Sequence, residues 1–404
     1  MKFGSRIRPA LRATRHAGHH PAISVVRAVG LLLCLFGCGP PQTAAPTAAA
    51  PTAAPTAAPT AVVAEEPVLN VYNWYDYIKP DVLREFKAKT GIAVRYNVFD
   101  SNNTLETKLL AGHSGYDVVF PSAAYLSALM PAGVFQKLDK TRLPNLANMD
   151  PAIMQRLAAQ DPGNAHAVVY AWGMTGLAYD VAKIRARLPG VPLDSWSVLL
   201  DPKLAAKLAD CGIGLYESPN VVVPSVLAWL GENPNSEDPQ LLQRAAASLL
   251  KVRKFVRKIS TGSLVDDLAS GEVCLIIASN GDAMQAQERT RIAGKGKEVG
   301  FILPKEGAVM WMDVAAIPSD APHPGNAHRF IDFLMDAAVA AENTNAIRFP
   351  NGNRASQGQV NPGLANARIY PSGDQAARLI PELPKSESYV RLRTRMWTRF
   401  RTGQ

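Results

Sequence analysis

Residues 68–130 read VLNVYNWYDYIKPDVLREFKAKTGIAVRYNVFDSNNTLETKLLAGHSGYDVVFPSAAYLSALM, in which apolar runs alternate with amphipathic segments. The alternation predicts an α/β fold with a largely parallel sheet and right-handed crossovers. The expected strands are Val68–Trp74, Ile92–Phe99 and Tyr116–Phe120, and the expected helices are Lys79–Thr90, Thr104–Ala111 and Ala123–Met130. Ligands of such sheets bind beyond the carboxyl ends of the strands, and these ends carry Trp74–Tyr77, Asp100–Asn102 and Pro121–Ser122.

The first two helices have recognisable start and stop signals. Pro80 stands near the first helical position of one helix, and Gly91 follows its end. Ser101 and Asn102 are candidate caps for the next helix.

A second group of strands and helices follows, at Val168–Ala178, Gly212–Tyr216, Pro224–Leu230 (helix), Gln240–Phe255 (helix), Val273–Ala278 and Val309–Pro318. In the last strand, Asp313 is a lone carboxylate among apolar residues. Because an unpaired carboxylate is costly to bury, we expect Asp313 to face a cleft at the strand end or to meet a cation there. A buried salt bridge to Arg or Lys is the structural alternative.

The N-terminus has the pattern of an export signal. Residues 1–37 hold six basic and no acidic residues, and the apolar run Ala28–Gly37 ends before Cys38. The pattern predicts a lipoprotein signal peptide over residues 1–37, with Cys38 as the lipid-modified first residue of the exported protein. A conventional signal peptide cleaved elsewhere is the alternative. Without this segment the formal charge falls from +9 to +3, which does not favour a nucleic-acid partner.

The following segment and the cysteines agree with export. Residues 38–66 are rich in Pro, Ala and Thr, a composition that favours an extended tether. Cys34 leaves with the signal peptide, and Cys38 is the candidate lipid site, so an even pair remains in an oxidising compartment. We expect Cys211 and Cys274 to form a disulfide that closes a long loop. Two buried free thiols are the alternative.

Enzyme motifs are weak in this chain. The histidines after the signal segment, His113, His166, His323 and His328, are scattered and have no paired metal-ligand spacing. No phosphate-binding glycine loop and no nucleophile elbow is present. We therefore expect no catalysis, no metal and no cofactor.

Short motifs in colinear order extend over about residues 68–403, at Val71–Ile78, Val98–Asn102, Gly115–Val119, Pro121–Ser122, Asp194–Trp196, Lys305–Ala308, Asn351–Asn353 and Arg393–Thr398. Together they resemble the periplasmic polyamine-binding proteins, which are type II periplasmic solute-binding proteins, and most closely the putrescine-binding receptors among them. The resemblance implies two lobes that close over a ligand in the cleft between them. It also implies a disulfide between Cys211 and Cys274.

The resemblance implies lobe boundaries as well. Lobe 1 is expected to comprise residues 67–170 and 288–337, and lobe 2 residues 171–287 and 338–404. The chain would then cross between the lobes near Tyr170, Gln287 and Ala337.

Carried over position by position, the resemblance implies nine ligand-binding residues: Trp74, Tyr75, Asp76, Tyr77, Ser122, Asp282, Trp311, Asp313 and Phe349. The three aspartates would bind ammonium groups, the rings of Trp74, Tyr77 and Trp311 would form a hydrophobic box, and Ser122 would orient an end group. The alternatives are ordinary: the two tryptophans as core residues, and Asp76 and Asp282 as turn or helix-cap residues.

Four positions depart from the family pattern. Tyr75 replaces a small hydroxyl residue, Val221 a ligand-binding Glu, Ser279 a Trp, and Phe349 a Tyr. The site thereby loses one carboxylate and one large ring. Three acidic residues are candidates to compensate, namely Glu217, Asp266 and Asp267.

The resemblance implies a function. The protein would be a monomeric, periplasmic lipoprotein that captures putrescine, agmatine, cadaverine or spermidine and delivers it to the permease of an ABC transporter. It would contact the membrane through its lipid anchor only. The alternative is a sensor lipoprotein whose altered pocket reports a ligand to a membrane partner.

Overall fold

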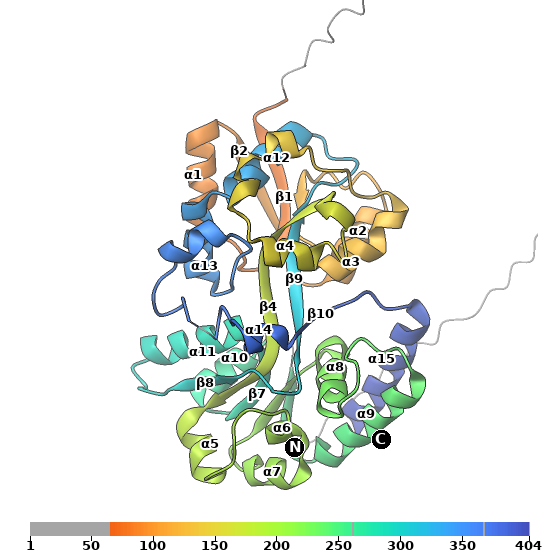
Figure 1. The fold of residues 1–404 in the computed structure, drawn as a ribbon, viewed down its shortest axis with the longest axis vertical. Coiled ribbons are helices and arrows are strands. Elements are labelled where there is room, and N and C mark those ends of the chain that lie inside the picture. The colour runs from red at the N-terminus through yellow and green to blue at the C-terminus, as the bar shows by residue number, and fades with distance from the viewer. Residues whose placement is uncertain (1–64, 261, 367, 404) are drawn as a thin grey trace, which may run out of the picture. The chain divides into compact units, whose positions relative to one another are not determined.

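A computed structural model describes residues 65–260, 262–366 and 368–403 (Figure 1). The predicted signal peptide, the candidate lipid site Cys38 and nearly all of the predicted tether lie outside these residues. Within the described ranges, none of the helices combines the length and the hydrophobicity that a membrane span requires.

The strands are β1 (Val68–Trp74), β2 (Ala93–Phe99), β3 (Val118–Val119), β4 (Ala167–Asp180), β5 (Ile213–Tyr216), β6 (Val256–Ser260), β7 (Leu275–Ser279), β8 (Val299–Ile302), β9 (Ala308–Ala316) and β10 (Leu379–Pro381). The helices are α1 (Pro80–Thr90), α2 (Asn102–Leu110), α3 (Ala123–Leu129), α4 (Pro151–Leu157), α5 (Val181–Arg187), α6 (Ser197–Leu200), α7 (Pro202–Leu208), α8 (Pro219–Trp229), α9 (Pro239–Arg253), α10 (Leu264–Ser270), α11 (Asn280–Ile292), α12 (Pro324–Leu334), α13 (Ala337–Ile347), α14 (Asp374–Ala377) and α15 (Glu387–Thr402).

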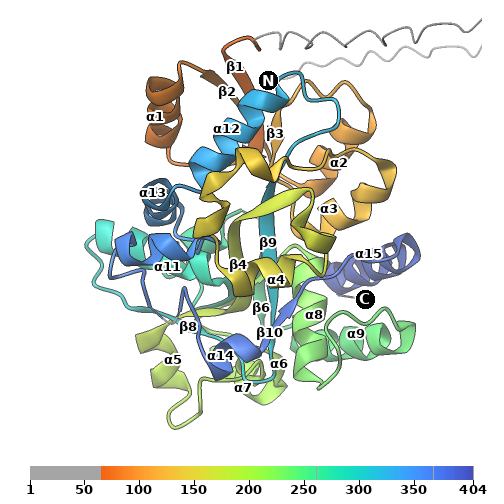
Figure 2. The same cartoon turned by 45° about the horizontal axis from the view of Figure 1, so that its top comes forward.

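Lobe 1 is built on the predicted parallel unit. Its strands are ordered β2-β1-β3-β9-β4, and β1 pairs in parallel with both β2 and β3. Helices α1, α12 and α13 lie on one side of these strands, and α2 and α3 lie on the other (Figure 2). Both faces of β1 are largely buried, which explains why its sequence is apolar without a strict alternation.

The local signals in the sequence define the helix ends. Gly91 follows α1 in the left-handed region, with φ 75°, and its amide donates to the carbonyl of Lys87. The side chain of Ser101 accepts a hydrogen bond from the amide of Thr104 and caps α2. Helix α8 begins five residues before its predicted start, because Pro219 and not Pro224 is its first residue.

Two long strands, β4 and β9, connect the lobes (Figure 1). Residues Ala167–Met174 of β4 pair with β9, and residues Thr175–Tyr179 pair with β7 of lobe 2. The lobe 2 strands are ordered β4-β7-β5-β6, with β8 beside β4. In lobe 2, α9 packs against α8 and α15, while α10 and α11 pack against each other.

The first crossover lies four residues after Tyr170, close to its predicted position, whereas the segments after Gln287 and Ala337 lie in other lobes than predicted. Strand β4 changes partners after Met174, and β8 pairs with Leu177–Asp180 of β4, so that residues 299–302 lie in lobe 2. In α13, Val339 and Ile347 belong to the core of lobe 1. At two of the crossovers the chain passes between the lobes within the long strands β4 and β9, where the composition does not change.

The end of the predicted tether is attached to lobe 1. Both carboxylate oxygens of Glu65 accept hydrogen bonds from the first turn of α12, from the amides of Gly325 and Asn326, each at 2.7 Å. The side chain of Asn326 donates to the carbonyl of Glu66 at 2.8 Å. The folded body therefore includes Glu65 and Glu66, which were predicted as tether.

The predicted disulfide is present. Cys211 and Cys274 are bonded across 63 positions of sequence, with their Cα atoms 5.5 Å apart. The bond joins a residue that lies shortly after α7 to the residue before β7, and both cysteines are buried.

Candidate functional site

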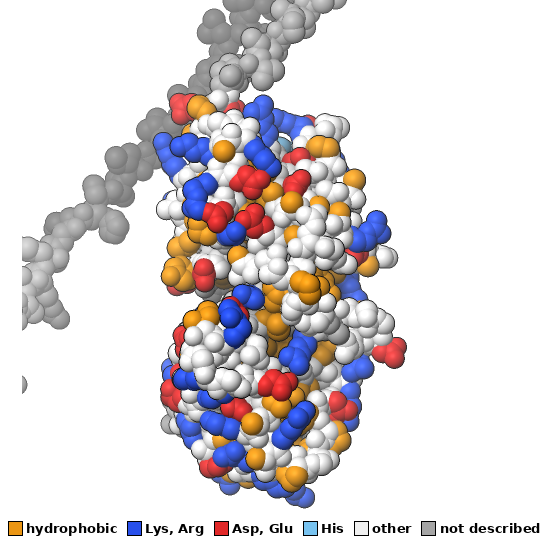
Figure 3. Space-filling model, turned by 90° about the vertical axis from the view of Figure 1, so that its left-hand side faces the viewer, with side chains coloured by type: hydrophobic (Ala, Val, Ile, Leu, Met, Phe, Trp, Pro, Cys, Tyr) orange, Lys and Arg blue, Asp and Glu red, His pale blue; other side chains and the backbone are white. Residues whose placement is uncertain are grey.

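A cleft of about 910 Å³ is lined by residues of both lobes. Lobe 1 contributes the ends of β1 and β2 and the start of α3, and lobe 2 contributes Tyr216–Val221, the start of α11 and one side of α15. The crossing strand β9 contributes Val309, Trp311 and Asp313. On one face of the body, hydrophobic side chains gather at mid-height between surfaces rich in charged residues (Figure 3).

Asp313 is held by hydroxyl groups. One carboxylate oxygen accepts a hydrogen bond from the Ser122 hydroxyl at 2.7 Å, and the other accepts one from the Tyr77 hydroxyl at 3.0 Å. Ser122 is itself positioned by Asn102, whose side chain donates to the Ser122 oxygen and accepts from the Ser122 amide, each at 3.0 Å. Within the described residues, no Lys, Arg or His nitrogen lies within 4.0 Å of Asp313, so the salt-bridge alternative does not apply.

The surroundings of Asp313 change its acidity. The side chain is 6% exposed, and burial raises the pKa of Asp313 from 3.8 to about 7, although the hydrogen bonds from Ser122 and Tyr77 act in the opposite direction. Burial and the neighbouring Asp313 raise the pKa of Tyr77 well above its usual value, so Tyr77 is a hydrogen-bond donor at neutral pH. The cleft therefore holds a carboxylate that is costly to ionise without a positive partner.

Asp282 lies across the cleft, on the first turn of α11. One of its oxygens accepts hydrogen bonds from the amide of Ser279 at 3.0 Å, from the hydroxyl of Ser279 at 2.6 Å, and from the hydroxyl of Tyr216. The first of these bonds belongs to a capping box with Ser279. Asp282 is thus a helix-cap residue that also lines the cleft, and its role as an ammonium ligand stays a prediction.

Aromatic rings line the same cleft as these carboxylates. The ring of Phe349 is 5.3 Å from that of Trp311 and 5.8 Å from that of Tyr77, with interplanar angles of 70° and 65°. Trp74 packs against Phe99 at 4.5 Å. Trp74 and Trp311 are only partly buried and line the cleft, so they are not simple core residues.

Glycines create the space for two of these rings. A Cβ atom on Gly173 of β4 would lie 2.3 Å from the Trp311 ring, and one on Gly281 of α11 would lie 2.2 Å from the Phe349 ring. The absence of a side chain at these positions allows the rings to lie against the strand and the helix.

Substituting alanine for Gly173 should displace the Trp311 ring and destabilise the protein by at least about 1 kcal/mol, because overpacking strains a close-packed core. The free energy of unfolding in urea measures the effect. Gly358→Ala is the matched control, since a Cβ atom at Gly358 would have no neighbour within 4 Å. Equal stability of the two variants would contradict the placement of Trp311.

The structure brings together eight of the nine predicted site residues, Trp74, Tyr75, Tyr77, Ser122, Asp282, Trp311, Asp313 and Phe349. Tyr75 lies at the surface of the cleft with 79% of its side chain exposed. Asp76 does not line the cleft: it is exposed and has a positive φ of 53°, which orients the turn after β1. Val221 and Ser279, two of the positions that depart from the family pattern, also line the cleft.

The compensating carboxylates proposed from the sequence are paired elsewhere. Glu217 lines the cleft but forms an ion pair with Arg401. Asp266 pairs with Arg289, and Asp267 pairs with Lys258; neither aspartate lines the cleft.

Sequence reasoning missed two charged residues of the cleft, Glu382 and Arg393. Glu382 follows β10, and burial raises the pKa of its carboxyl group. Arg393 of α15 is 4% exposed and donates to the side-chain oxygen of Asn220 at 2.5 Å. The only signal for Arg393 was its place in the Arg393–Thr398 motif, and Glu382 lay in no motif.

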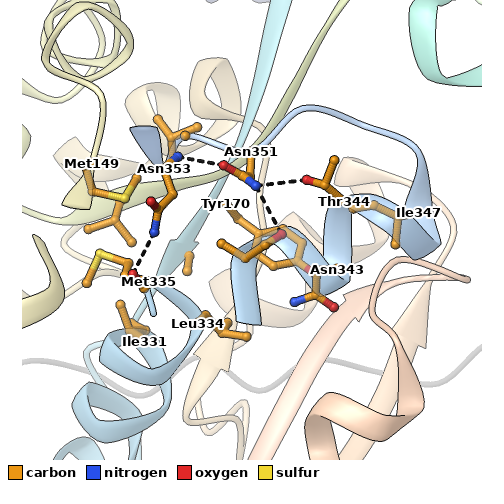
Figure 4. Close-up of a pocket in the computed structure, with 15 residues that line it drawn as sticks. Met149, Tyr170, Ile331, Leu334, Met335, Asn343, Thr344, Ile347, Asn351 and Asn353 are labelled. Carbon is orange, nitrogen blue, oxygen red and sulfur yellow. Dashed lines mark hydrogen bonds between the residues drawn. The ribbon is translucent and has the colours of Figure 1, made fainter. Parts of the chain in front are cut away.

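A second cavity lies beside the start of β4 and is too small for a ligand (Figure 4). Its volume of about 20 Å³ suits a single water molecule. The Asn351 side chain points to Thr344 and donates to its hydroxyl at 2.9 Å, and the Asn353 side chain donates to the carbonyl of Met335 at 2.7 Å. These bonds fasten the segment that follows α13.

Within the described residues, no three His, Cys, Asp or Glu side chains are placed to hold a metal ion.

Comparison with known proteins identifies relatives over most of the chain. The family model for the bacterial extracellular solute-binding proteins matches residues 81–363. The putrescine-binding periplasmic protein of Pseudomonas aeruginosa is 41% identical over 345 residues, which are 84% of this chain and 94% of the relative. The putrescine-binding periplasmic protein of Escherichia coli is 39% identical over 346 residues, 85% of this chain and 94% of the relative.

Solved structures support the fold. A spermidine/putrescine ABC transporter substrate-binding protein of Streptococcus pneumoniae matches with a TM-score of 0.73 and 24% identity, over 83% of this chain and 99% of that protein. A lipoprotein of Treponema pallidum matches with a TM-score of 0.71 and 22% identity, over 82% and 99%. Two lobes joined by crossing strands, with a cleft between them, define a two-lobed periplasmic binding protein. The chain belongs to the family of bacterial extracellular solute-binding proteins.

Proposed function

We propose that this protein captures putrescine or a related polyamine outside the cytoplasm and passes it to an ABC importer. The observation that carries the proposal is the pair Asp313 and Asp282, which line one cleft together with aromatic rings and have no basic partner within 4.0 Å in the described part of the chain. The cleft lining contains five carboxylates, those of Asp100, Glu217, Asp282, Asp313 and Glu382, but among the described residues only one basic group, that of Arg393.

The chemistry of a diamine fits this arrangement. Its two ammonium groups form charge-assisted hydrogen bonds with carboxylates, and the methylene chain between them is apolar. The rings of Trp311 and Phe349 offer an apolar wall, and cation–π contacts add about 0.5–2 kcal/mol each. The relatives named as putrescine-binding proteins at about 40% identity support the same ligand class.

We infer a periplasmic protein held on the membrane by a lipid on Cys38, a monomer that acts without catalysis. The basic segment and apolar run before Cys38 support the anchor, and the names of the relatives support the periplasm and the transporter.

A thermal-shift screen of the purified protein tests the ligand class. Putrescine, cadaverine, agmatine and spermidine at about 1 mM should each be compared with butylamine, which has one ammonium group, and γ-aminobutyrate, in which a carboxylate replaces the second. At least one polyamine should raise the unfolding midpoint more than both controls. If no polyamine shifts the midpoint, or if γ-aminobutyrate shifts it most, the proposal fails.

Polyamine affinity should fall as the pH falls, because a cation binds the ionised form of Asp313. A pKa of about 7 in the empty cleft means that Asp313 is mostly ionised at about pH 8 and mostly protonated at about pH 6. The dissociation constant of the polyamine should therefore be about tenfold higher at about pH 6 than at about pH 8. At the lower pH, binding should release a proton from Asp313. Calorimetric titrations across this range measure it, and a flat profile would contradict the assignment of Asp313.

A further inference from the structure

Helices α9 and α15 lie next to each other in lobe 2 and run in the same direction (Figure 1). At their beginnings, the amide of Ser386 donates to a carboxylate oxygen of Glu237 at 3.1 Å. At their ends, the guanidinium group of Arg253 donates to the carbonyls of Phe400 and Arg401, each at 3.1 Å. The negative ends of two helix macrodipoles therefore lie together, and cations are favourable there.

Four exposed basic side chains surround this junction of helix ends and form what we call the basic patch: Lys251 and Lys254 of the end of α9, and Arg395 and Arg399 of the second half of α15. In the described part of the chain, no carboxylate oxygen lies within 4.0 Å of their nitrogens. Helix α9 contains no acidic residue, and that of α15, Glu387, lies in the first turn, away from the patch. Leu250, which is 41% exposed, precedes Lys251.

The members of the basic patch repel one another. Lys251 and Lys254 are three residues apart, and Arg395 and Arg399 are four residues apart, so each pair lies on one face of its helix, where like charges destabilise the helix. The helix-end carbonyls offset this repulsion only in part, because Arg253 already donates to two of them. Bound anions would remove it. Since the four charges are spread over two helices, they suit an array of anionic groups better than one small anion.

The surface of an anionic membrane is the occupant that the rest of the chain favours. The segment from Cys38, the proposed lipid site, to Glu65, which is attached to lobe 1, spans 27 positions. Such a Pro-rich segment reaches about 80 Å when extended and about 30 Å as a flexible chain, so it keeps the body close to the membrane at a high effective concentration. Anionic headgroups attract exposed Lys and Arg side chains, and the headgroup boundary accommodates an apolar side chain such as Leu250.

We propose that the basic patch docks lobe 2 on anionic lipid headgroups. This contact is additional to the lipid anchor on Cys38, which we expected from the sequence to be the only membrane contact. The inference goes beyond the capture of a polyamine. The residues of α15 that line the cleft are Val390, Arg393, Thr394 and Trp397, and no member of the patch is among them. The patch and the cleft therefore lie on different faces of α15, so that docking and ligand binding are compatible.

Co-sedimentation with lipid vesicles tests the inference. The full chain carries Cys38→Ser, so that no lipid anchor contributes to binding. At about 50 mM salt, vesicles of phosphatidylcholine with about 30% phosphatidylglycerol should bind at least about fivefold more protein than vesicles of phosphatidylcholine alone. This excess should fall severalfold at about 300 mM salt, because salt screens the attraction between exposed charges.

Two variants of this chain with equal net charge show whether the patch is responsible. Replacing all four patch residues with glutamine should remove at least about four fifths of the excess, and replacing only the pair on α9 or only the pair on α15 should remove about half of it. The matched control replaces two Lys and two Arg of lobe 1 with glutamine, which are exposed and have no ion pair among the described residues: Lys87, Arg95, Lys108 and Arg329. The control should keep at least about two thirds of the excess.

Docking is refuted if the starting chain binds both kinds of vesicle equally, if the patch variant binds like the starting chain, or if the control loses as much binding as the patch variant. Each variant should unfold within about 3 °C of the starting chain, which shows that its fold is kept. A chain that sediments with anionic vesicles but shows no thermal shift with any polyamine would contradict the proposed function and support docking.

Discussion

Replacing Asp313 with asparagine should weaken polyamine binding at least about tenfold, because the variant loses a charge-assisted hydrogen bond in a water-poor site. Ser122 and Tyr77 surround the side chain with hydroxyl groups that both donate and accept, so the amide can be accommodated without loss of fold. Titration calorimetry against the wild-type protein measures the loss. Unchanged affinity would show that Asp313 does not bind the ligand.

The same substitution should stabilise the empty protein at neutral pH. The pKa of Asp313 is higher in the folded than in the unfolded chain, so the folded state holds an extra proton between about pH 4 and about pH 7. The stability of the wild-type protein therefore falls as the pH rises through this window. The asparagine side chain has no proton to lose, so the variant should unfold at a higher temperature than the wild type near pH 8, and at a similar one near pH 4. A lower midpoint at both values would contradict the assignment of an unpaired buried carboxylate.

Removing the disulfide should have the largest effect on stability. Its loop of 63 residues corresponds to about 4 kcal/mol in the chain-entropy model. Replacing Cys211 and Cys274 with alanine should therefore lower the unfolding midpoint on the order of 10 °C. Refolded wild-type protein with both thiols reduced is the control, because it keeps the two buried sulfur atoms and loses only the bond. If the unfolding midpoint of the reduced protein lies within about 2 °C of that of the oxidised protein, the disulfide adds little to the stability.

The first helices of the fold were predictable because their start and stop signals lie next to the turns that they determine. Pro80, Gly91 and Ser101 act on the neighbouring turn, and the helices they delimit begin and end within two residues of the predicted positions. The lobe boundaries were not predictable in this way. The chain passes from lobe to lobe inside β4, where residues on both sides of Met174 are equally buried.

The site was predictable to a similar extent. Asp313 stood out because a single carboxylate in an apolar strand requires a special environment, and eight of the nine residues implied by the resemblance line one cleft. Asp76 failed to reach the cleft because it lies in a left-handed turn and is exposed to solvent. Glu382 was missed because its position depends on the pairing of β10 with β9, about 70 positions earlier in the chain.

The central claim is that the carboxylates of the cleft bind the ammonium groups of a polyamine. A calorimetric titration of the purified protein with putrescine at about pH 8 and low salt measures this binding most directly. The account predicts saturable binding of one putrescine per chain, weakened in the Asp313→Asn variant. Absence of binding heat up to about 1 mM putrescine, together with an unchanged unfolding midpoint, would contradict it.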